Sequence, residues 1–260
     1  MKVSVVIPTL NAASTIERAL LSVRASSLGS QVEAIVVDSL SPDGTAALAE
    51  KHATVIRVKA GRFEARAIGA REASGEFVMN MDADQVLEPT ALERAYSSGY
   101  RAVAFEEVVT GRGIVAAMDS LDKRVIGSHV AENLDPIKGS IKPRFYDRGA
   151  LIRAYERVGD LGKRLTAYED AVLYWEVSRE VPTAGYVERG IYHAEDMGLI
   201  EYARKWARYG RSARALKGTK YEFFLRNRGM RIGSVRERAP LIGLVALKGF
   251  SFALGYYLGR

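Results

Sequence analysis

Between residues 3 and 81, short runs rich in β-branched residues alternate with stretches of helical spacing, and this alternation constrains the fold more than any other feature. The apolar runs predict strands at Val3–Pro8, Ala34–Asp38, Thr54–Val58 and Phe77–Met81. The stretches between them predict helices at Ser14–Ala25, Thr45–Lys51 and Glu64–Ala73. Strands and helices that alternate in this way build a mostly parallel sheet flanked by helices. We therefore expect an α/β fold that binds ligands beyond the carboxyl ends of its strands.

Beyond residue 101 the pattern is less regular and the predicted elements are shorter. They are a strand at Ala102–Phe105, a helix at Ile114–Ile126, a strand at Arg144–Asp147, a helix at Tyr168–Glu180, and extended segments at Thr183–Val187 and Gly190–His193. From residue 196 onward the chain becomes helical and basic, and then apolar. We expect one α/β domain over residues 1–198, followed over residues 199–260 by basic amphipathic helices and an apolar C-terminal helix.

Composition narrows the chemistry that the chain can perform. Among its 260 residues there is no cysteine, which excludes disulfides, iron–sulfur clusters, thiolate zinc sites and cysteine nucleophiles. With three histidines in the sequence, a bound metal would be held mainly by carboxylate oxygens, and this favours Mg²⁺ or Mn²⁺ over Zn²⁺. The net charge of +7 predicts an anionic partner, such as a nucleoside diphosphate, a nucleic acid or a membrane surface.

The C-terminal region combines a basic run with an apolar run. Arginine and lysine crowd residues 204–238, and Leu241–Leu258 is almost entirely apolar, with Lys248 as its one charge. The apolar run has the length of a membrane-spanning helix, and a basic flank suits the cytoplasmic side beside anionic lipid. A helix buried against the rest of the protein is the alternative. We expect membrane association, spanning or interfacial, with the α/β domain in the cytoplasm and no N-terminal signal peptide.

The strand predicted at Phe77–Met81 runs directly into Asp82-Ala83-Asp84. Two carboxylates separated by one residue on a turn can chelate one hard cation. Mg²⁺ or Mn²⁺ bound there would neutralise a diphosphate and stabilise it as a leaving group. A solvated surface turn is the alternative, because Asp-x-Asp occurs by chance in many chains. Asp38 also ends a predicted strand, so both acidic motifs are expected at the carboxyl edge of the sheet.

Five motifs follow one another in a characteristic order. They are VVIPTLN at 5–11, VVDSLSPDGT at 36–45, ARAIGAR at 65–71, ASGEFV at 73–78 and DAD at 82–84. In order and spacing they resemble the family 2 glycosyltransferases, which have the GT-A fold and include the dolichyl-phosphate mannose synthases and cellulose synthase. The resemblance is strong over residues 3–90, fair over about 140–195 and thin beyond.

This resemblance implies roles for residues in each motif. The residues implied to contact the nucleotide are Pro8, Thr9, Asn11 and Asp38, of which Asp38 would hydrogen-bond the base or ribose. Arg66 would approach the diphosphate, and Asp82 and Asp84 would bind the metal and the sugar. Many relatives carry Asp or Asn after the second-motif aspartate, where this chain has Ser39, so the identity of the base stays open.

A later match is Glu169-Asp170, near the start of the predicted helix at Tyr168–Glu180. Members of the family carry a Glu-Asp pair here, and its Asp acts as the general base. The resemblance thus implies that Asp170 is the base and that Glu169 positions acceptor hydroxyls. In-line displacement at the anomeric carbon does need a carboxylate opposite the leaving diphosphate. The helix dipole alone also favours carboxylates at a helix start, which is the structural alternative.

Three single residues complete the candidate site. His193 is a candidate metal ligand, because many GT-A enzymes place a late histidine near the metal, although a lone histidine is more often packed or at the surface. Arg144 falls where relatives have a loop over the donor phosphates, with ordinary loop charge as the alternative. Trp206 ends Tyr202-Ala203-Arg204-Lys205-Trp206, which only partly matches the Gln-x-x-Arg-Trp motif of processive members. It is a candidate for stacking on an acceptor sugar, and helix packing is the alternative.

Together these features predict an inverting, metal-dependent glycosyltransferase that moves a sugar from a nucleotide-sugar donor to a lipid-linked acceptor presented on a membrane. GDP-mannose is the first expected donor and UDP-sugars the next, with Mn²⁺ or Mg²⁺ as cofactor and no nucleic-acid partner. One alternative is a polyprenyl-phosphate sugar synthase, whose phosphate acceptor needs no base. A sugar-phosphate nucleotidyltransferase is another, although its usual Gly-rich loop is replaced by Pro8–Asn11. A third is a binding module without catalysis that relies on its basic tail.

Overall fold

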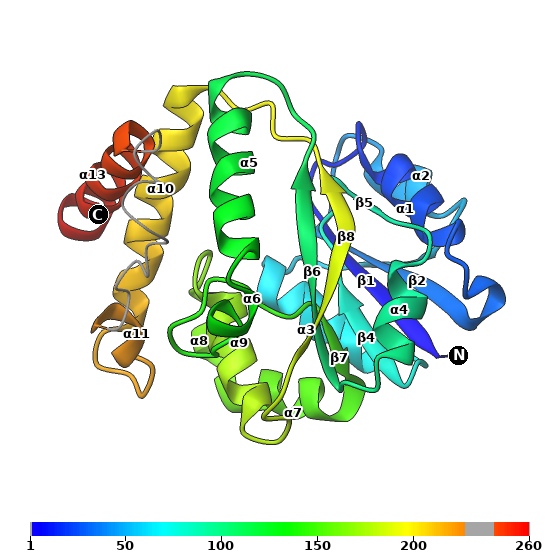
Figure 1. Ribbon diagram of the computed structural model, residues 1–260. Coiled ribbons are helices and arrows are strands. Elements are labelled where there is room, and N and C mark those ends of the chain that lie inside the picture. Colours follow the sequence, from blue (N-terminus) through cyan, green and yellow to red (C-terminus); the bar gives the residue numbers. More distant parts are fainter. Residues whose placement is uncertain (1, 227–241, 260) are drawn as a thin grey trace. The chain divides into compact units, whose positions relative to one another are not determined.

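The computed structural model describes residues 2–226 and 242–259 (Figure 1). The chain divides into two compact units. Unit 1 comprises residues 1–108, 143–163 and 176–193, and unit 2 comprises residues 109–142, 164–175 and 194–260. The units therefore interleave along the chain and do not follow a single boundary after residue 198. Part of the predicted basic run, residues 227–238, and Leu241 lie outside the described residues.

An eight-stranded sheet runs through unit 1, in the order β3-β2-β1-β4-β7-β6-β8-β5. Its strands are β1 Val3–Thr9, β2 Val32–Asp38, β3 Thr54–Arg57, β4 Phe77–Asn80, β5 Gln85–Leu87, β6 Ala102–Val109, β7 Phe145–Asp147 and β8 Gly185–His193. The neighbours β3, β2, β1 and β4 are parallel, as the strand–helix alternation predicts. The pairs β4–β7, β6–β7 and β5–β8 are antiparallel. Strand β1 is buried almost throughout, as expected for a strand inside a parallel sheet.

Helices cover the sheet of unit 1 and bury its apolar side chains. They are α1 Ile16–Arg24, α2 Thr45–Ala49, α3 Arg62–Glu72, α4 Ala91–Ser97, α7 Arg148–Val158 and α8 Asp160–Lys163. Helix α1 shows why the sequence folds this way, because its buried residues Ile16, Ala19, Leu20 and Val23 lie on one helical face. They join Val5, Ile7 and other strand residues in one large hydrophobic core.

Helix α3 lies unusually close to the sheet because of a glycine. A Cβ atom placed on Gly69 would lie 2.3 Å from Cγ1 of Val6 on β1, so no larger residue fits without movement. Val6 is fully buried and has a short, stiff side chain that offers little room to relax. The close approach brings Arg66, three residues earlier on α3, to the edge of the sheet where β4 ends.

Unit 2 is helical. Its helices are α5 Ile114–Gly127, α6 Val130–Asn133, α10 Leu199–Ala213, α11 Phe223–Arg226 and α13 Ile242–Leu258. Helix α9, Glu169–Ser178, begins in unit 2 and ends in unit 1. Helices α10 and α13 pack side by side (Figure 1). Glycines allow the close contact, because a Cβ on Gly210 would meet the backbone of Phe252, and one on Gly255 would meet the backbone of Ala207.

The single charge of α13 lies on the face that packs. Lys248 forms ion pairs with Asp119 at 3.5 Å and Asp122 at 3.2 Å, both on α5. Its ammonium also lies over the rings of Tyr202 and Trp206 on α10. The predicted alternative of a packed C-terminal helix thus holds for one face of α13. Within residues 2–226 and 242–259, no helix combines the length and apolar character that crossing a bilayer requires.

Several elements differ from the sequence-based expectation. Helix α1 begins at Ile16, and its N-cap Thr15 makes no side-chain capping bond, so the predicted start at Ser14 is two residues early. The two extended segments predicted near residues 183–193 form one strand, β8. The pattern also missed β5, α4 and α7. These three are short or lie where strand–helix alternation gives way to antiparallel pairing, which leaves little local periodicity to recognise.

The close packing of α3 on β1 predicts the effect of filling its glycine. We expect Gly69→Ala to lower the free energy of unfolding by about 1–2 kcal/mol, because overpacking outweighs the better helix propensity of alanine. Gly249→Ala is the matched control, because it adds the same methyl group to α13. Beyond the helix's own backbone, no atom of the described residues lies within 4 Å of the new Cβ, so this variant should be neutral or slightly stabilising. Urea denaturation of both variants measures the difference, and a stabilised Gly69→Ala protein would contradict the described contact.

Candidate active site

The turn after β4 places two acidic side chains at the carboxyl edge of the parallel strands. The side chain of Gln85 accepts a hydrogen bond from the Asp82 backbone N–H at 3.0 Å, and the Gln85 N–H donates to the Asp82 carbonyl at 3.1 Å. Gln85 is buried and begins β5, where it pairs with His193 of β8. This antiparallel register brings Asp84, the residue before Gln85, beside His193.

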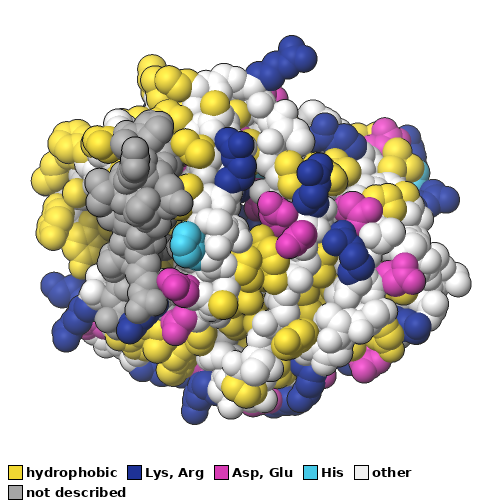
Figure 2. All heavy atoms as spheres, in the orientation of Figure 1, with side chains coloured by type: hydrophobic (Ala, Val, Ile, Leu, Met, Phe, Trp, Pro, Cys, Tyr) yellow, Lys and Arg dark blue, Asp and Glu magenta, His cyan; other side chains and the backbone are white. Residues whose placement is uncertain are grey.

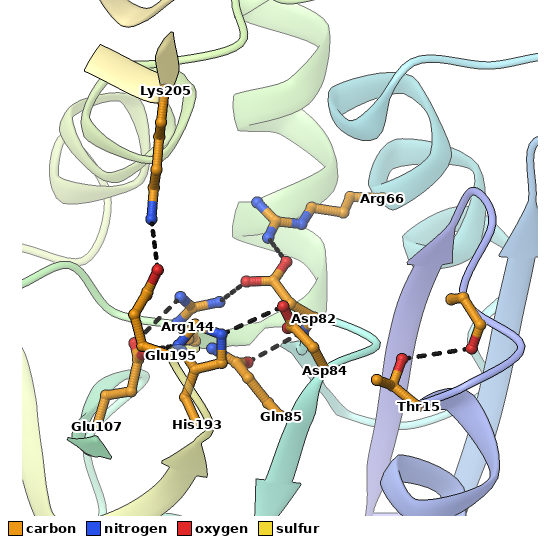
Figure 3. Close-up of polar contacts among 11 residues, drawn as sticks. Thr15, Arg66, Asp82, Asp84, Gln85, Glu107, Arg144, His193, Glu195 and Lys205 are labelled. Atoms are coloured by element: carbon orange, nitrogen blue, oxygen red, sulfur yellow. Dashed lines mark hydrogen bonds and ion pairs between the residues drawn. The ribbon is translucent and has the colours of Figure 1, made fainter. Parts of the chain in front are cut away.

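Asp82 lies between two arginines (Figure 3). Nη2 of Arg66 donates to its Oδ1 at 2.7 Å, and Nη1 of Arg144 donates to its Oδ2 at 3.0 Å. Burial by itself would raise the pKa of Asp82, but the charges of Arg66, Arg144 and Arg62 outweigh burial and hold that pKa well below its usual range. The Asp82 carboxylate is therefore ionised at neutral pH, and each of its oxygens accepts a charge-assisted hydrogen bond.

Each arginine reaches Asp82 from a defined element. Arg66 projects from α3 and is only 2% exposed. Arg144 immediately precedes β7, and its backbone is fixed on both sides: its carbonyl accepts from the Asn80 N–H, and its own N–H donates to the Val103 carbonyl. The two guanidinium groups are thus held in place by helix α3 and by the backbone that leads into β7. Such donors suit a phosphate or diphosphate, which arginine binds through paired hydrogen bonds.

His193 links the second aspartate to a further carboxylate. Its Nε2 lies 3.2 Å from Oδ2 of Asp84, and its Nδ1 lies 2.9 Å from Oε1 of Glu107 on β6. These two hydrogen bonds, with Asp84 as the larger effect, raise the pKa of His193 to about 10 against the lowering by burial. Nη2 of Arg144 lies 3.7 Å from Oε2 of Glu107. Opposite charges therefore alternate along one chain of contacts, which runs Arg66, Asp82, Arg144, Glu107, His193 and Asp84 (Figure 3).

The predicted metal ligands fit a divalent cation only in part. Asp84 and His193 place a carboxylate oxygen and a ring nitrogen together, and the Asp84 side chain is 53% exposed. The Asp82 carboxylate is engaged by arginines, and in the described part of the chain no three His, Asp or Glu side chains converge as a metal-binding group. Mg²⁺ and Mn²⁺ are commonly held by one or two protein ligands together with substrate phosphates. Asp84 and His193 are the side chains that would hold a cation of that kind.

The loops after β1 and β2 are braced against each other through Asp38. This residue is fully buried; its Oδ1 accepts from the hydroxyls of Thr9 and Ser41, and its Oδ2 accepts from the Ser41 N–H. Asn11 has a positive φ of 55°, and its N–H donates to the Ser41 hydroxyl. Pro8 pairs with Val37 inside the parallel ladder. These contacts bring together the four residues that are expected to contact the nucleotide. Contact of Asp38 with a base or ribose stays a prediction.

The remaining candidates belong to unit 2. Glu169 is buried at the start of α9, and Asp170, the next residue, is partly exposed. Tyr168 before them has a φ of 67°, a left-handed conformation that is uncommon outside glycine. Trp206 packs against Tyr202 and Tyr209, with ring centroids 6.2 and 5.5 Å apart. These contacts favour the packing role of Trp206, and its stacking on an acceptor sugar stays a prediction.

Sequence reasoning missed two residues of this constellation. Glu107 contacts both His193 and Arg144, and Ser41 donates two of the three hydrogen bonds that the Asp38 carboxylate accepts. Ser41 stands inside the motif VVDSLSPDGT at 36–45, so its polar side chain gave a usable signal. Glu107 lies in a stretch with no recognisable motif. Its role is visible only once β6 takes its place in the sheet.

Residues 4–99 match the family model described as Glycosyl transferase family 2. The matched region runs from β1 to α4 and includes Thr9, Asp38, Arg66 and the Asp82–Asp84 turn. The motifs quoted from the sequence thus coincide with the region that the family model recognises. A comparison with curated protein sequences gives no match.

Solved structures share the fold over most of the chain. TarS residues 1–349 from S. aureus in complex with UDP-GlcNAc is 18% identical, with a TM-score of 0.56 over 86% of this chain and 69% of that one. Glucosyl-3-phosphoglycerate synthase from Mycobacterium tuberculosis in complex with Mn²⁺, UDP and glucosyl-3-phosphoglycerate is 21% identical, with a TM-score of 0.55 over 84% and 80%. Mannosyl-3-phosphoglycerate synthase from Rubrobacter xylanophilus is 21% identical, with a TM-score of 0.54 over 84% and 74%. Residues 4–99 thus match glycosyltransferase family 2, and the chain shares the GT-A-like fold of these solved structures.

Proposed function

We propose that this protein is an inverting, metal-dependent glycosyltransferase that uses a nucleoside diphosphate sugar as donor. The observation that carries the proposal is the Asp82–Asp84 turn, where two framework-held arginines and the Asp84–His193 pair meet at the carboxyl edge of the sheet. Arg66 and Arg144 supply charge for the diphosphate. When bound at Asp84 and His193, a divalent cation supplies Lewis-acid stabilisation of the departing nucleoside diphosphate.

The identity of the donor nucleotide is proposed on two kinds of support. Resemblance to dolichyl-phosphate mannose synthases favours GDP-mannose. The structures of TarS and of glucosyl-3-phosphoglycerate synthase contain UDP or a UDP-sugar, and this favours a UDP-sugar for the present chain. Because the structures of TarS and glucosyl-3-phosphoglycerate synthase contain UDP or a UDP-sugar, we place UDP-sugars first and GDP-mannose second.

Asp170 is the proposed general base. In a single displacement, an acceptor hydroxyl oxygen bonds to the anomeric carbon as the bond from that carbon to the diphosphate oxygen breaks. The hydroxyl proton passes to the Asp170 carboxylate, and the nucleoside diphosphate leaves. Glu169, its buried neighbour, is proposed to position the acceptor. A phosphate acceptor carries no proton that must be removed, so a requirement for Asp170 separates a hydroxyl acceptor from a polyprenyl phosphate.

The acceptor is proposed to be lipid-linked, with the protein bound to the membrane surface through α13. The outward face of this helix is apolar and includes Ile242, Phe250, Leu254, Tyr257 and Leu258, which are all exposed. Figure 2 shows hydrophobic side chains gathered over α13, at the left of the view. Arg214 donates to the Gly259 carbonyl at the end of this helix, and the exposed Arg211 also lies beside Gly259. An apolar helical face with arginines at its rim suits the interface of an anionic membrane.

Nucleotide binding tests the proposed donor site. In calorimetric titrations with UDP, GDP and dTDP, we expect one nucleotide to bind at least about tenfold more tightly with Mn²⁺ than with EDTA, a gain of about 1.4 kcal/mol. Asp84→Asn should remove that gain because it removes a ligand charge. Asp160→Asn, which neutralises a highly exposed carboxylate on α8, is the control and should keep it. Binding without any metal effect in the parent protein would contradict the proposal.

Removing the proposed base should separate binding from chemistry. We expect Asp170→Asn to lower the rate of transfer to a hydroxyl acceptor by about 10²–10⁴-fold while Kd for the donor nucleotide stays within about twofold. Glu169→Gln should instead raise KM for the acceptor. Transfer is followed with a radiolabelled donor sugar. Full activity of Asp170→Asn with a lipid hydroxyl acceptor would show that another group removes the proton.

Vesicle binding tests the membrane proposal. We expect the protein to co-sediment with vesicles containing an anionic phospholipid, and less with purely zwitterionic ones. The double variant Phe250→Gln, Tyr257→Gln should bind at least about tenfold more weakly, because two side chains can no longer be buried in the interface. Leu21→Gln, which removes an exposed leucine from α1, is the control. Equal binding by all three proteins would assign the attachment to other residues.

A further inference from the structure

Glu107 contacts the two cationic groups of the site at once. Its Oε1 lies 2.9 Å from Nδ1 of His193, and its Oε2 lies 3.7 Å from Nη2 of Arg144. The Glu107 side chain is only 19% exposed, so both contacts are partly shielded from water. Each carboxylate oxygen thus serves a different partner, and the residue joins the Asp84–His193 pair to the Asp82–Arg144 pair.

The imidazole ring lies between two carboxylates. Its Nδ1 faces Glu107 and its Nε2 faces Asp84, and the two ring nitrogens of a histidine point in different directions. Glu107 therefore contacts the opposite edge of the ring from the edge that faces the exposed Asp84. A carboxylate accepts hydrogen bonds and donates none when ionised. The contact with Glu107 consequently requires a proton on Nδ1.

We propose that Glu107 is a positioning residue of the cation site: it holds the ring of His193 with a proton on Nδ1, so that Nε2 is the nitrogen that gives up its proton and binds a divalent cation beside Asp84. This inference rests on the proposed function. Carboxylate–histidine pairs of this kind fix the tautomer and the orientation of a ligating histidine, and loss of the carboxylate weakens metal binding by about 10–100-fold. Glu107 also restrains Arg144 on the side away from Asp82, so it orders both halves of the site.

The strand itself provides a matched control. Glu106 is the neighbour of Glu107 on β6, and successive side chains of a strand point to opposite faces. The Glu106 carboxylate accepts a hydrogen bond from the Arg189 backbone N–H at 2.7 Å. Glu106→Gln and Glu107→Gln therefore make the same chemical change on adjacent residues, and only the second lies against His193 and Arg144.

The first measurement is Mn²⁺ affinity, read from the electron paramagnetic resonance signal of free Mn²⁺ with and without UDP. We expect Glu107→Ala to weaken Mn²⁺ binding by about 10–100-fold. Glu107→Gln should recover part of that loss, because its amide oxygen can still accept from Nδ1–H, and Glu106→Gln should match the parent protein. Parent-like Mn²⁺ binding by Glu107→Ala would overturn the role inferred for Glu107 and leave the proposed function unaffected. No Mn²⁺ binding by the parent protein would instead overturn the proposed function together with it.

The second measurement needs neither metal nor activity. The sequence has three histidines, His52, His129 and His193, and a ring N–H that donates to a carboxylate is protected from exchange with water. We expect a downfield ¹⁵N-coupled ring proton that disappears in His193→Gln, which assigns it, and in Glu107→Ala. The signal should persist in Glu106→Gln. Amide spectra of each variant verify folding, and persistence of the signal in a folded Glu107→Ala protein would refute the proposed hydrogen bond.

Discussion

The partly buried ion pair between Arg66 and Asp82 is the interaction on which the site depends. A guanidinium group that is almost fully buried is costly unless a carboxylate accepts its hydrogen bonds. Here that carboxylate stands where β4 ends, so the pair connects α3 to the carboxyl edge of the sheet. The distance of 2.7 Å in turn requires α3 to lie close to β1, which the absence of a side chain at Gly69 permits. The ion pair therefore depends on the close packing of α3 against β1.

Pairing of opposite charges continues from Asp82 across the antiparallel half of the sheet. Arg144 is fixed by backbone hydrogen bonds to the strand ends on both sides, and it shares its charge between Asp82 and Glu107. His193 then lies between Glu107 and Asp84. Because every charge has an opposite neighbour, the side chains are ordered before any ligand arrives. Such pre-organisation is what electrostatic catalysis requires, since groups already in place need no rearrangement during the reaction.

Helix α13 shows how one apolar segment can serve two environments. Its Lys248 lies against α5 and its Gly255 against α10, whereas Phe250, Leu254 and Tyr257 are exposed. Hydropathy averages these faces and predicts membrane association, spanning or interfacial, without separating the two faces. The division between them arises from partners elsewhere in unit 2, such as Asp119 and Asp122, which hydropathy does not register. Counting apolar residues therefore describes the composition of this helix but does not show which of its faces is packed.

The sequence by itself determined the parallel half of the sheet, the helices between those strands and the family resemblance of residues 4–99, and it indicated the edge at which Asp38 and Asp82 lie. These features follow from local periodicity and from motifs that occupy consecutive residues. Tertiary structure alone decided that Asp84 meets His193, that Arg144 reaches Asp82, and that Glu107 lies behind them. Asp84 and His193 are 109 residues apart and are joined by the register of β5 with β8. The physical reason is that strand pairing between distant segments is selected by the packing of the whole sheet, which no short stretch of sequence contains.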